Sequence, residues 1–282
     1  MTSRTSLTGL ALLMLLLPLS ASAEGLSEGI VGVVVDGNEL RAEISLPGGI
    51  GADLTLAFEQ VVGLTQANVG LNASLVSPLD TTLLARLTQA AVPAAFPLLI
   101  RIEPPADGGL SFSGPVTISL HTHNLPYLPG TLLRIYGATL GEPFEDITEY
   151  VGSGSYRCRG KKGSFSEFLI LVDLRPLSLT IREKLERLDV TLEENEAIID
   201  PAVYSQLTAL ASQIRAAYEG GNKSLAITRT NQFLAVVTNN SGSAIPNVWR
   251  SSRDLVNAAG LLRAAGETLR FSLGLKSNLG LL

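Results

Sequence analysis

The sequence predicts an α+β protein with segregated secondary structure, in which an N-terminal antiparallel β-sandwich is followed by a C-terminal antiparallel helical bundle. Upstream of Pro176, glycine and proline recur between short β-branched runs, which is typical of a many-stranded antiparallel domain. Downstream of Pro176, the apolar residues change from alternating spacing to the spacing of helices. We therefore place the sandwich at residues 24–175, a four-helix module at 176–273 and a frayed tail at 274–282, and we expect the two large parts to fold separately.

The first 23 residues have the pattern of a cleavable export signal. Arg4 precedes a leucine-rich run, and Ala21-Ser22-Ala23 ends the segment with the small residues that a signal peptidase accepts. The apolar run is too short to cross a bilayer. We expect cleavage after Ala23, a periplasmic or secreted protein, and no transmembrane segment in the mature chain.

Several segments of the N-terminal part have the composition or spacing of strands. The clearest are residues 29–35 and 38–46, which flank Asp36-Gly37, a pair that favours the type I′ turn of a hairpin. Residues 80–91 differ, because their leucines have helical spacing and predict a short helix at one end of the sheets. The other strands are expected at residues 53–58, 71–76, 96–103, 115–122, 131–136 and 165–173.

Four apolar stripes predict the helices of the C-terminal part. The first follows Pro176, and the second begins at Asp200-Pro201, an N-cap followed by proline at the first helical position. The third opens at Asn222, and the fourth is expected to follow Pro246 directly, with apolar or small residues at steps of three and four. Short connections between amphipathic helices of this length predict an antiparallel bundle.

Composition excludes some classes of protein. The net charge is −5 and charged residues make up 17% of the chain, which argues against a nucleic-acid binder. The chain has one cysteine, Cys158, so it cannot close an intramolecular disulfide. Cys158 lies in a strand-like segment and is expected to be a small buried side chain, with an intermolecular disulfide or a reactive thiol as the alternatives.

The two histidines, His121 and His123, are the residues considered for a metal site. Alternate positions of a strand face the same side, so both imidazoles could meet one ion. Zinc needs three or four ligands, and a carboxylate such as Glu103 or Asp107 would have to complete the set. The ligand set is incomplete in the sequence, so we predict no metal and interpret the pair as polar side chains on the solvated face of a strand.

No catalytic or cofactor-binding residue is predicted. The chain has no H-E-x-x-H, no Walker A sequence and no G-x-G-x-x-G after a strand. Residues 152–155 are glycine-rich but lack the G-x-S-x-G spacing of a nucleophile elbow. The pair Glu193-Glu194 is interpreted as part of a solvated helix face. A hydrolase would instead need carboxylates that converge in a cleft, for which the candidates are Asp53, Glu59, Glu103 and Asp107.

Two motifs resemble known modules. Phe144-Glu145-Asp146-Ile147-Thr148, followed by Phe165-Ser166-Glu167-Phe168, resembles the end of ZU5-like β-sandwiches, where a G-x-[WF]-x-D-[IV]-T strand precedes a closing H-F-S-x-[FY] strand. Some ZU5-type domains cleave themselves at the Phe-Ser bond with the help of a histidine, and this chain has Ser164 at the histidine position. Residues 216–242, with Asn231-Gln232-Phe233, resemble a FIMAH-type helical module, an accessory unit of exported bacterial enzymes and surface proteins.

Nearly the whole mature chain also resembles an uncharacterised family of exported proteobacterial proteins, most distinctly at residues 113–124 and 152–173. Together, the export signal, the missing catalytic motifs and the accessory-type module favour a non-enzymatic binding or structural protein of the bacterial envelope or exterior. Its expected partner is an envelope protein or a glycan, without a cofactor. The alternative is a secreted glycan or peptide hydrolase that carries an accessory helical module.

Overall fold

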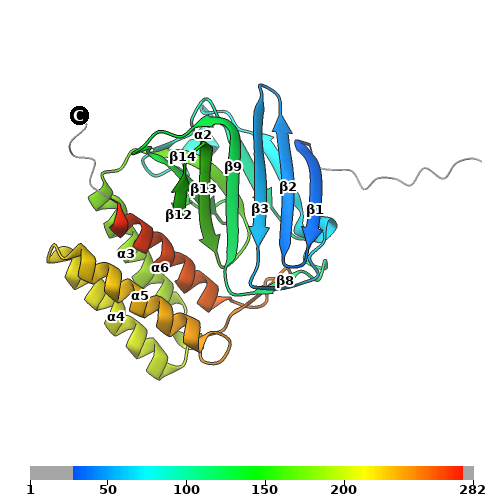
Figure 1. Ribbon diagram of the computed structural model, residues 1–282. Helices are drawn as coiled ribbons and strands as arrows, with labels where there is room; N and C mark the ends of the chain where they lie inside the picture. The colour runs from blue at the N-terminus through cyan, green and yellow to red at the C-terminus, as the bar shows by residue number, and fades with distance from the viewer. Residues whose placement is uncertain (1–27, 276–282) are drawn as a thin grey trace, which may run out of the picture.

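A computed structural model describes residues 28–275 of the chain (Figure 1). The export signal expected at residues 1–23 and the tail residues 276–282 lie outside the described residues. The predicted α+β class is confirmed, because antiparallel sheets form the N-terminal two-thirds and the long helices follow them. None of the described helices is long and apolar enough to cross a membrane.

The first sheet has six strands, and its side chains alternate between buried and exposed. In spatial order the strands are β1 (Ile30–Asp36), β2 (Glu39–Leu46), β3 (Ile50–Ala57), β9 (Val116–Pro126), β13 (Ser155–Lys162) and β12 (Thr148–Gly152). The predicted hairpin is formed by β1 and β2, but its turn residues are Gly37 and Asn38. Only Gly37 of the two has a positive φ, 57°, so the type I′ prediction is wrong and the turn matches type II′, which needs glycine at its first central position.

The second sheet packs against the inner face of the first. Its strands are, in spatial order, β11 (Glu145–Asp146), β10 (Leu133–Ala138), β14 (Glu167–Asp173), β7 (Leu98–Ile102) and β5 (Leu71–Leu75), and the short β6 (Ala90–Ala91) also pairs with β14. Buried side chains of both sheets form one hydrophobic core, with Leu54 and Ile118 from the first sheet and Ile100 and Phe168 from the second. The fold is therefore a two-sheet sandwich.

The outer face of the second sheet has a cover of its own. The predicted short helix is α2 (Thr81–Leu84), whose N-cap Asp80 accepts hydrogen bonds from the backbone N–H groups of Thr82 and Leu83. Leu83 packs with Leu99, Leu169 and Phe144 in a separate hydrophobic cluster. Another four-residue helix, α1 (Gln66–Val69), precedes β5. This cluster covers the part of the outer face around Leu99 and Leu169, whereas Asn72 of β5 stays exposed on the same face.

A small third sheet joins the two halves of the chain. It contains β4 (Gln60–Val62), β8 (Ser111–Ser113) and β15 (Val248–Arg250), with Trp249 paired to Phe112. Trp249 stacks on Phe112, with ring centroids 5.1 Å apart, and lies edge-on to Phe165 at 5.3 Å. The prediction that the fourth helix begins directly after Pro246 is therefore wrong, since these residues form a strand that covers the end of the sandwich core.

The four predicted long helices are α3 (Leu177–Glu194), α4 (Pro201–Glu219), α5 (Lys223–Asn240) and α6 (Ala258–Gly274), and the short η1 (Glu196–Ile198) connects α3 to α4. Asp200 and Asn222 cap α4 and α5 as predicted. Asp200 accepts hydrogen bonds from the backbone N–H groups of Ala202 and Val203, and Asn222 accepts one from the N–H of Leu225. The apolar stripes meet in a core of their own. In Figure 1 the helices lie beside the sandwich, and α6 packs against β12 and β13.

Cys158 is buried and unpaired, as predicted for a small core side chain. Burial raises the pKa of its thiol, so the reactive thiolate is disfavoured. The division of the chain into separately folding parts at Pro176 stays a prediction.

Candidate functional site

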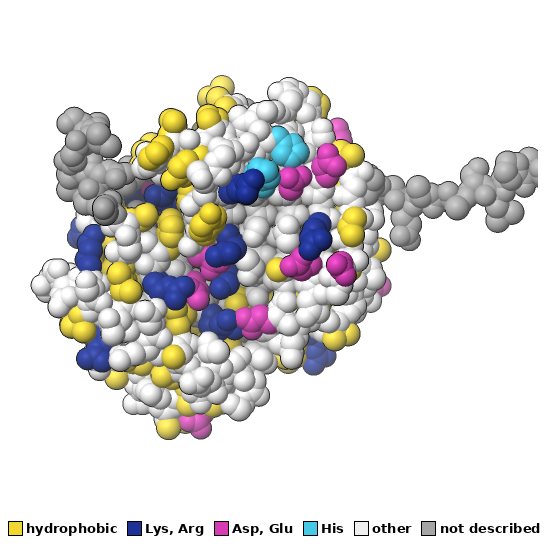
Figure 2. Space-filling view, viewed as in Figure 1, with side chains coloured by type: hydrophobic (Ala, Val, Ile, Leu, Met, Phe, Trp, Pro, Cys, Tyr) yellow, Lys and Arg dark blue, Asp and Glu magenta, His cyan; other side chains and the backbone are white. Residues whose placement is uncertain are grey.

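The outer face of the first sheet is exposed over much of its width (Figure 2). Every second residue of β2, β3, β9 and β13 turns its side chain toward this face, while the residues between them enter the core. The strand register places Asp53 between Glu43 and His121, and His121 beside Arg157. We call this exposed surface of the six-stranded sheet the outer face.

Short uncharged side chains form the middle of the outer face. Thr55 lies opposite Ser119 in the neighbouring strand, and Thr117 lies opposite Ala57. In Figure 2 this area is white, with charged side chains on both sides of it and the two histidines near its upper end. Hydroxyl groups on a sheet surface offer donors and acceptors without a net charge. The middle of the outer face can therefore contact a polar ligand without a large desolvation cost for charges.

His121 and His123 share one carboxylate partner at the end of this face. His121 Nδ1 lies 3.2 Å from Asp53 Oδ2, and His123 Nε2 lies 3.1 Å from Asp53 Oδ1. The imidazole of His123 lies over Gly51, where an added Cβ would come within 2.7 Å of His123 Nδ1. Glycine at this position makes room for the ring. The two histidines do share a face, as their spacing in the sequence predicts.

The carboxylate near the histidines is Asp53, and neither Glu103 nor Asp107 completes the set. Glu103 follows β7 of the other sheet, where its Oε1 lies 3.6 Å from Arg101 Nε. Asp53 could be found only from the register of β3 against β9, which the sequence does not specify. Within residues 28–275 no group of three or more His, Cys, Asp or Glu side chains has the arrangement of a metal site.

We predict that zinc or nickel, at a few equivalents, leaves the melting temperature unchanged. A site saturated a hundredfold above its dissociation constant would add about 2.7 kcal/mol to the free energy of unfolding, which a thermal scan resolves. The scan should compare parent protein with His123→Ala. A metal-dependent rise in the melting temperature that disappears in His123→Ala would contradict the prediction and establish a site at Asp53, His121 and His123.

Ion pairs border the outer face on the side of the helices. Glu149 of β12 pairs with Arg159 at 2.5 Å and with Lys161 at 3.2 Å. Lys161 also lies 3.8 Å from Glu267 of α6, so the border continues onto the helix. Arg157, in contrast, is exposed and has no ion-pair partner in the described part of the chain. Its guanidinium is available to an acceptor group of a ligand.

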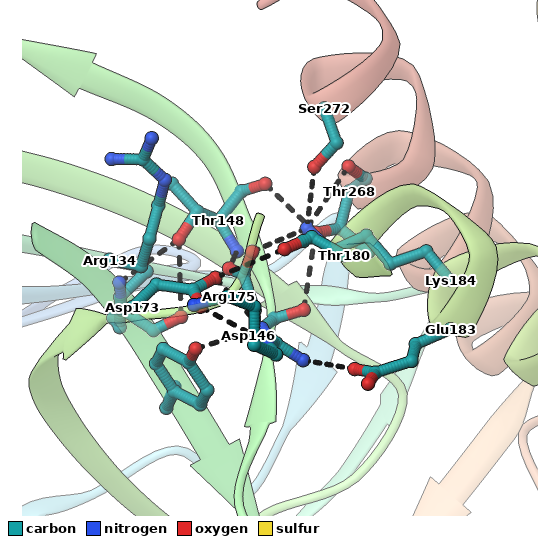
Figure 3. A network of polar contacts seen from close by, with 12 residues as sticks. Arg134, Asp146, Thr148, Asp173, Arg175, Thr180, Glu183, Lys184, Thr268 and Ser272 are labelled. Carbon is teal, nitrogen blue, oxygen red and sulfur yellow. Dashed lines mark hydrogen bonds and ion pairs between the residues drawn. The ribbon is translucent and has the colours of Figure 1, made fainter. Parts of the chain in front are cut away.

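A second polar cluster is buried where α3 and α6 meet the second sheet (Figure 3). Lys184 Nζ donates to Asp146 Oδ2 at 2.6 Å, to Thr268 Oγ1 at 2.6 Å and to Ser272 Oγ at 2.9 Å. Thr268 Oγ1 in turn donates to the carbonyl of Thr148 at 2.9 Å. Burial alone would raise the pKa of the Asp146 carboxyl, but the Lys184 ammonium and hydrogen bonds from Lys184 and Thr148 lower it below its usual value.

The same cluster continues through the end of β14. Arg175 pairs with Asp173 at 2.8 Å and with Glu183 of α3, and it donates to the Tyr136 hydroxyl at 2.9 Å. Burial, followed by the charge of Asp146, raises the pKa of the Tyr136 phenol, which stays protonated. The charged groups of this cluster form their ion pairs and hydrogen bonds with one another. We therefore interpret the cluster as the junction that holds the helices to the sandwich. Sequence reasoning missed it because its members come from distant segments of the chain.

The carboxylates considered for a hydrolase have separate surroundings. Asp53 meets the histidines, Glu103 approaches Arg101, and Glu59 Oε1 pairs with Arg263 Nη2 of α6 at 2.6 Å. Glu193 lines an open groove of about 410 Å³ between α3 and α4. In that groove Arg215 pairs with Asp189. The structure therefore does not bring the candidate carboxylates Asp53, Glu59 and Glu103 together in one cleft.

Comparisons with known proteins give one result. Residues 11–276 match a family model described as "Family of unknown function (DUF6689)". No curated protein matches the chain.

Proposed function

The chain belongs to this family of unknown function, and on that premise we propose that it is an exported, non-enzymatic protein that binds its ligand on the outer face. The single observation that supports this is the open, mixed polar surface of the six-stranded sheet. The outer face of the other large sheet is covered over Leu99 and Leu169 by the cluster that includes Leu83 of α2, and α6 packs against β12 at the side of the sandwich.

The chemistry of the outer face favours a polar and extended ligand. Its middle offers the hydroxyl groups of Thr55, Thr117 and Ser119, and the exposed Arg157 can donate two parallel hydrogen bonds to an acidic group. A glycan strand or the polar surface of an envelope protein has this chemistry. The leader that ends at Ala23 supports a location in the bacterial envelope or outside the cell, where both ligands occur.

The test compares two variants of the mature protein, which begins at residue 24. Ser119→Arg places a long charged side chain in the middle of the outer face, whereas Ser205→Arg makes the same change on the exposed surface of α4. Each protein is immobilised and exposed to a glycan panel and to envelope extracts. We expect Ser119→Arg to weaken capture of the bound glycan or protein by at least about tenfold, a loss of about 1.4 kcal/mol, and Ser205→Arg to bind as the parent does.

Equal capture by both variants would place the ligand elsewhere on the molecule. The hydrolase alternative is tested with the same materials, because incubation with the glycans or with peptides would then release smaller products. Product formation by the parent would contradict the non-enzymatic proposal.

A further inference from the structure

Within residues 28–275, the helices leave the β1 edge of the first sheet open. At the other end of the first sheet, α6 packs against β12. β1 stands first in the strand order, and no other described strand pairs with its free side. An exposed edge strand is a template for pairing with another chain, which proteins usually prevent with charged residues or proline. β1 has the sequence IVGVVVD, with neither lysine, arginine nor proline.

The register of β1 against β2 shows which backbone groups are unused. Asp36 and Glu39 flank the two-residue turn and form the first hydrogen-bonded pair, so Val34, opposite Arg41, also bonds to β2. The intervening residues Val33 and Val35 therefore direct their N–H and C=O groups away from β2, toward solvent. A bulge between Ile30 and Gly32 interrupts the ladder, so the regular part of the edge is the segment from Gly32 to Asp36.

Two apolar side chains of this segment face water. Val34 is 60% exposed and Val35 is 38% exposed. Val34 is on the outer face, beside the charged side chain of Arg41. An exposed valine on the regular part of a free edge points to a partner that covers it.

We propose that β1 pairs antiparallel with β1 of a second copy of this chain, about a two-fold axis at Val34. In this register Val33 lies opposite Val35 of the other copy, and each pair exchanges two backbone hydrogen bonds. Val34 lies opposite its own counterpart at a non-hydrogen-bonded position, where side chains come closest. Asp36 lies opposite Gly32, so no charge faces another charge. The segment is complementary to itself, and this favours a second copy over an unrelated strand.

The pairing would join two six-stranded sheets into one continuous sheet. A two-fold axis perpendicular to the sheet keeps both outer faces on the same side. A ligand with repeating units could then bind both faces at once, which raises the apparent affinity without a new contact. This consequence rests on the proposed function, whereas the dimer itself does not.

Sedimentation velocity of the mature parent protein tests the pairing over a range of concentrations. We expect a reversible dimer, and we expect Val34→Lys to raise its dissociation constant by at least about tenfold, because two like charges then lie directly opposite each other. The matched control is Val62→Lys, at a strand position of β4 that is 69% exposed. It should dimerise as the parent does.

A cysteine variant tests the register without weakening the edge. At a non-hydrogen-bonded pair the Cα atoms lie about 4.5 Å apart, within the range that a disulfide spans. Mild oxidation of Val34→Cys should give a covalent dimer, and Val62→Cys should not, while the buried Cys158 stays unreactive. A parent that is monomeric at all concentrations, a dimer that survives in Val34→Lys, or a Val34→Cys protein that does not cross-link would each overturn the proposal.

Discussion

Replacing Lys184 with alanine should lower the free energy of unfolding by about 3–5 kcal/mol, because it leaves the buried Asp146 carboxylate without its counter-charge. Both side chains are nearly inaccessible, and the Lys184 ammonium also donates to Thr268 and Ser272 of α6. The loss therefore combines an unpaired buried charge with unsatisfied hydroxyl groups at the junction. Chemical denaturation followed by circular dichroism measures it.

Two controls separate the buried charge from the loss of side-chain volume. The double variant Lys184→Met/Asp146→Asn removes both charges. The amide oxygen at position 146 can still accept the hydrogen bond from the Thr148 N–H. We therefore expect the double variant to recover most of the free energy of unfolding that Lys184→Ala loses. Lys223→Ala, at the start of α5, should have little effect. A double variant as unstable as Lys184→Ala would contradict the role of the charge.

The pH dependence of this effect has a defined sign. Because the pKa of Asp146 is lowered in the folded parent, its charged form contributes stability above the unfolded pKa, and this contribution is lost as the pH falls through the folded pKa. In Lys184→Ala, burial without the ammonium raises that pKa. The raised pKa lets Asp146 take up a proton in the variant already above about 4, the ordinary pKa of an aspartate, whereas in the parent it stays charged to lower pH. The stability difference between parent and variant should therefore begin to narrow above about pH 4 and continue to narrow as the pH falls further.

The sequence predicted the structure best where that structure depends on residues close together in the chain. Asp200-Pro201 and Asn222 mark helix starts because capping is local, and the change of period at Pro176 marks the change of architecture. The start of the fourth helix could not be found this way. The spacing around Val248 also fits a helix, but Trp249 gains more by joining the aromatic cluster of the sandwich than by extending α6.

The candidate site was predictable only in part. That His121 and His123 share a face follows from the two-residue period of a strand. Their partner Asp53, and the neighbouring Arg157, depend on which strands become neighbours and in which register. The short strands β4 and β8 were missed for the same reason, since each is defined by its pairing with a distant segment.

Residues 24–175, expressed without the C-terminal half, should be far less stable than the same residues in the full chain. The sequence led us to expect that both halves fold separately, and the contacts between them now favour dependence of the sandwich on the helices. Trp249, Asn257 and Lys184 all come from the C-terminal half. Without Trp249 the rings of Phe112 and Phe165 lose their cover. Without Asn257 the carbonyls of Gly114 and Gly163 lose donors at 2.7 and 3.2 Å.

A single substitution should reproduce part of this loss in the full chain. Trp249→Ala removes a large buried ring and should cost about 3–5 kcal/mol of stability. The matched control is Leu128→Ala, whose side chain is 66% exposed. It should leave the melting temperature nearly unchanged.

The fragments decide whether the halves depend on each other. Residues 176–282 have their own apolar core in α3 to α6 and should retain a helical far-ultraviolet spectrum when alone. We expect the melting temperature of residues 24–175 to lie well below that of the full chain and to rise when residues 176–282 are added, because the added fragment restores Trp249, Asn257 and Lys184. A cooperative melt of the isolated sandwich at the temperature of the full chain would show that the two are independent domains, held together by contacts that neither needs.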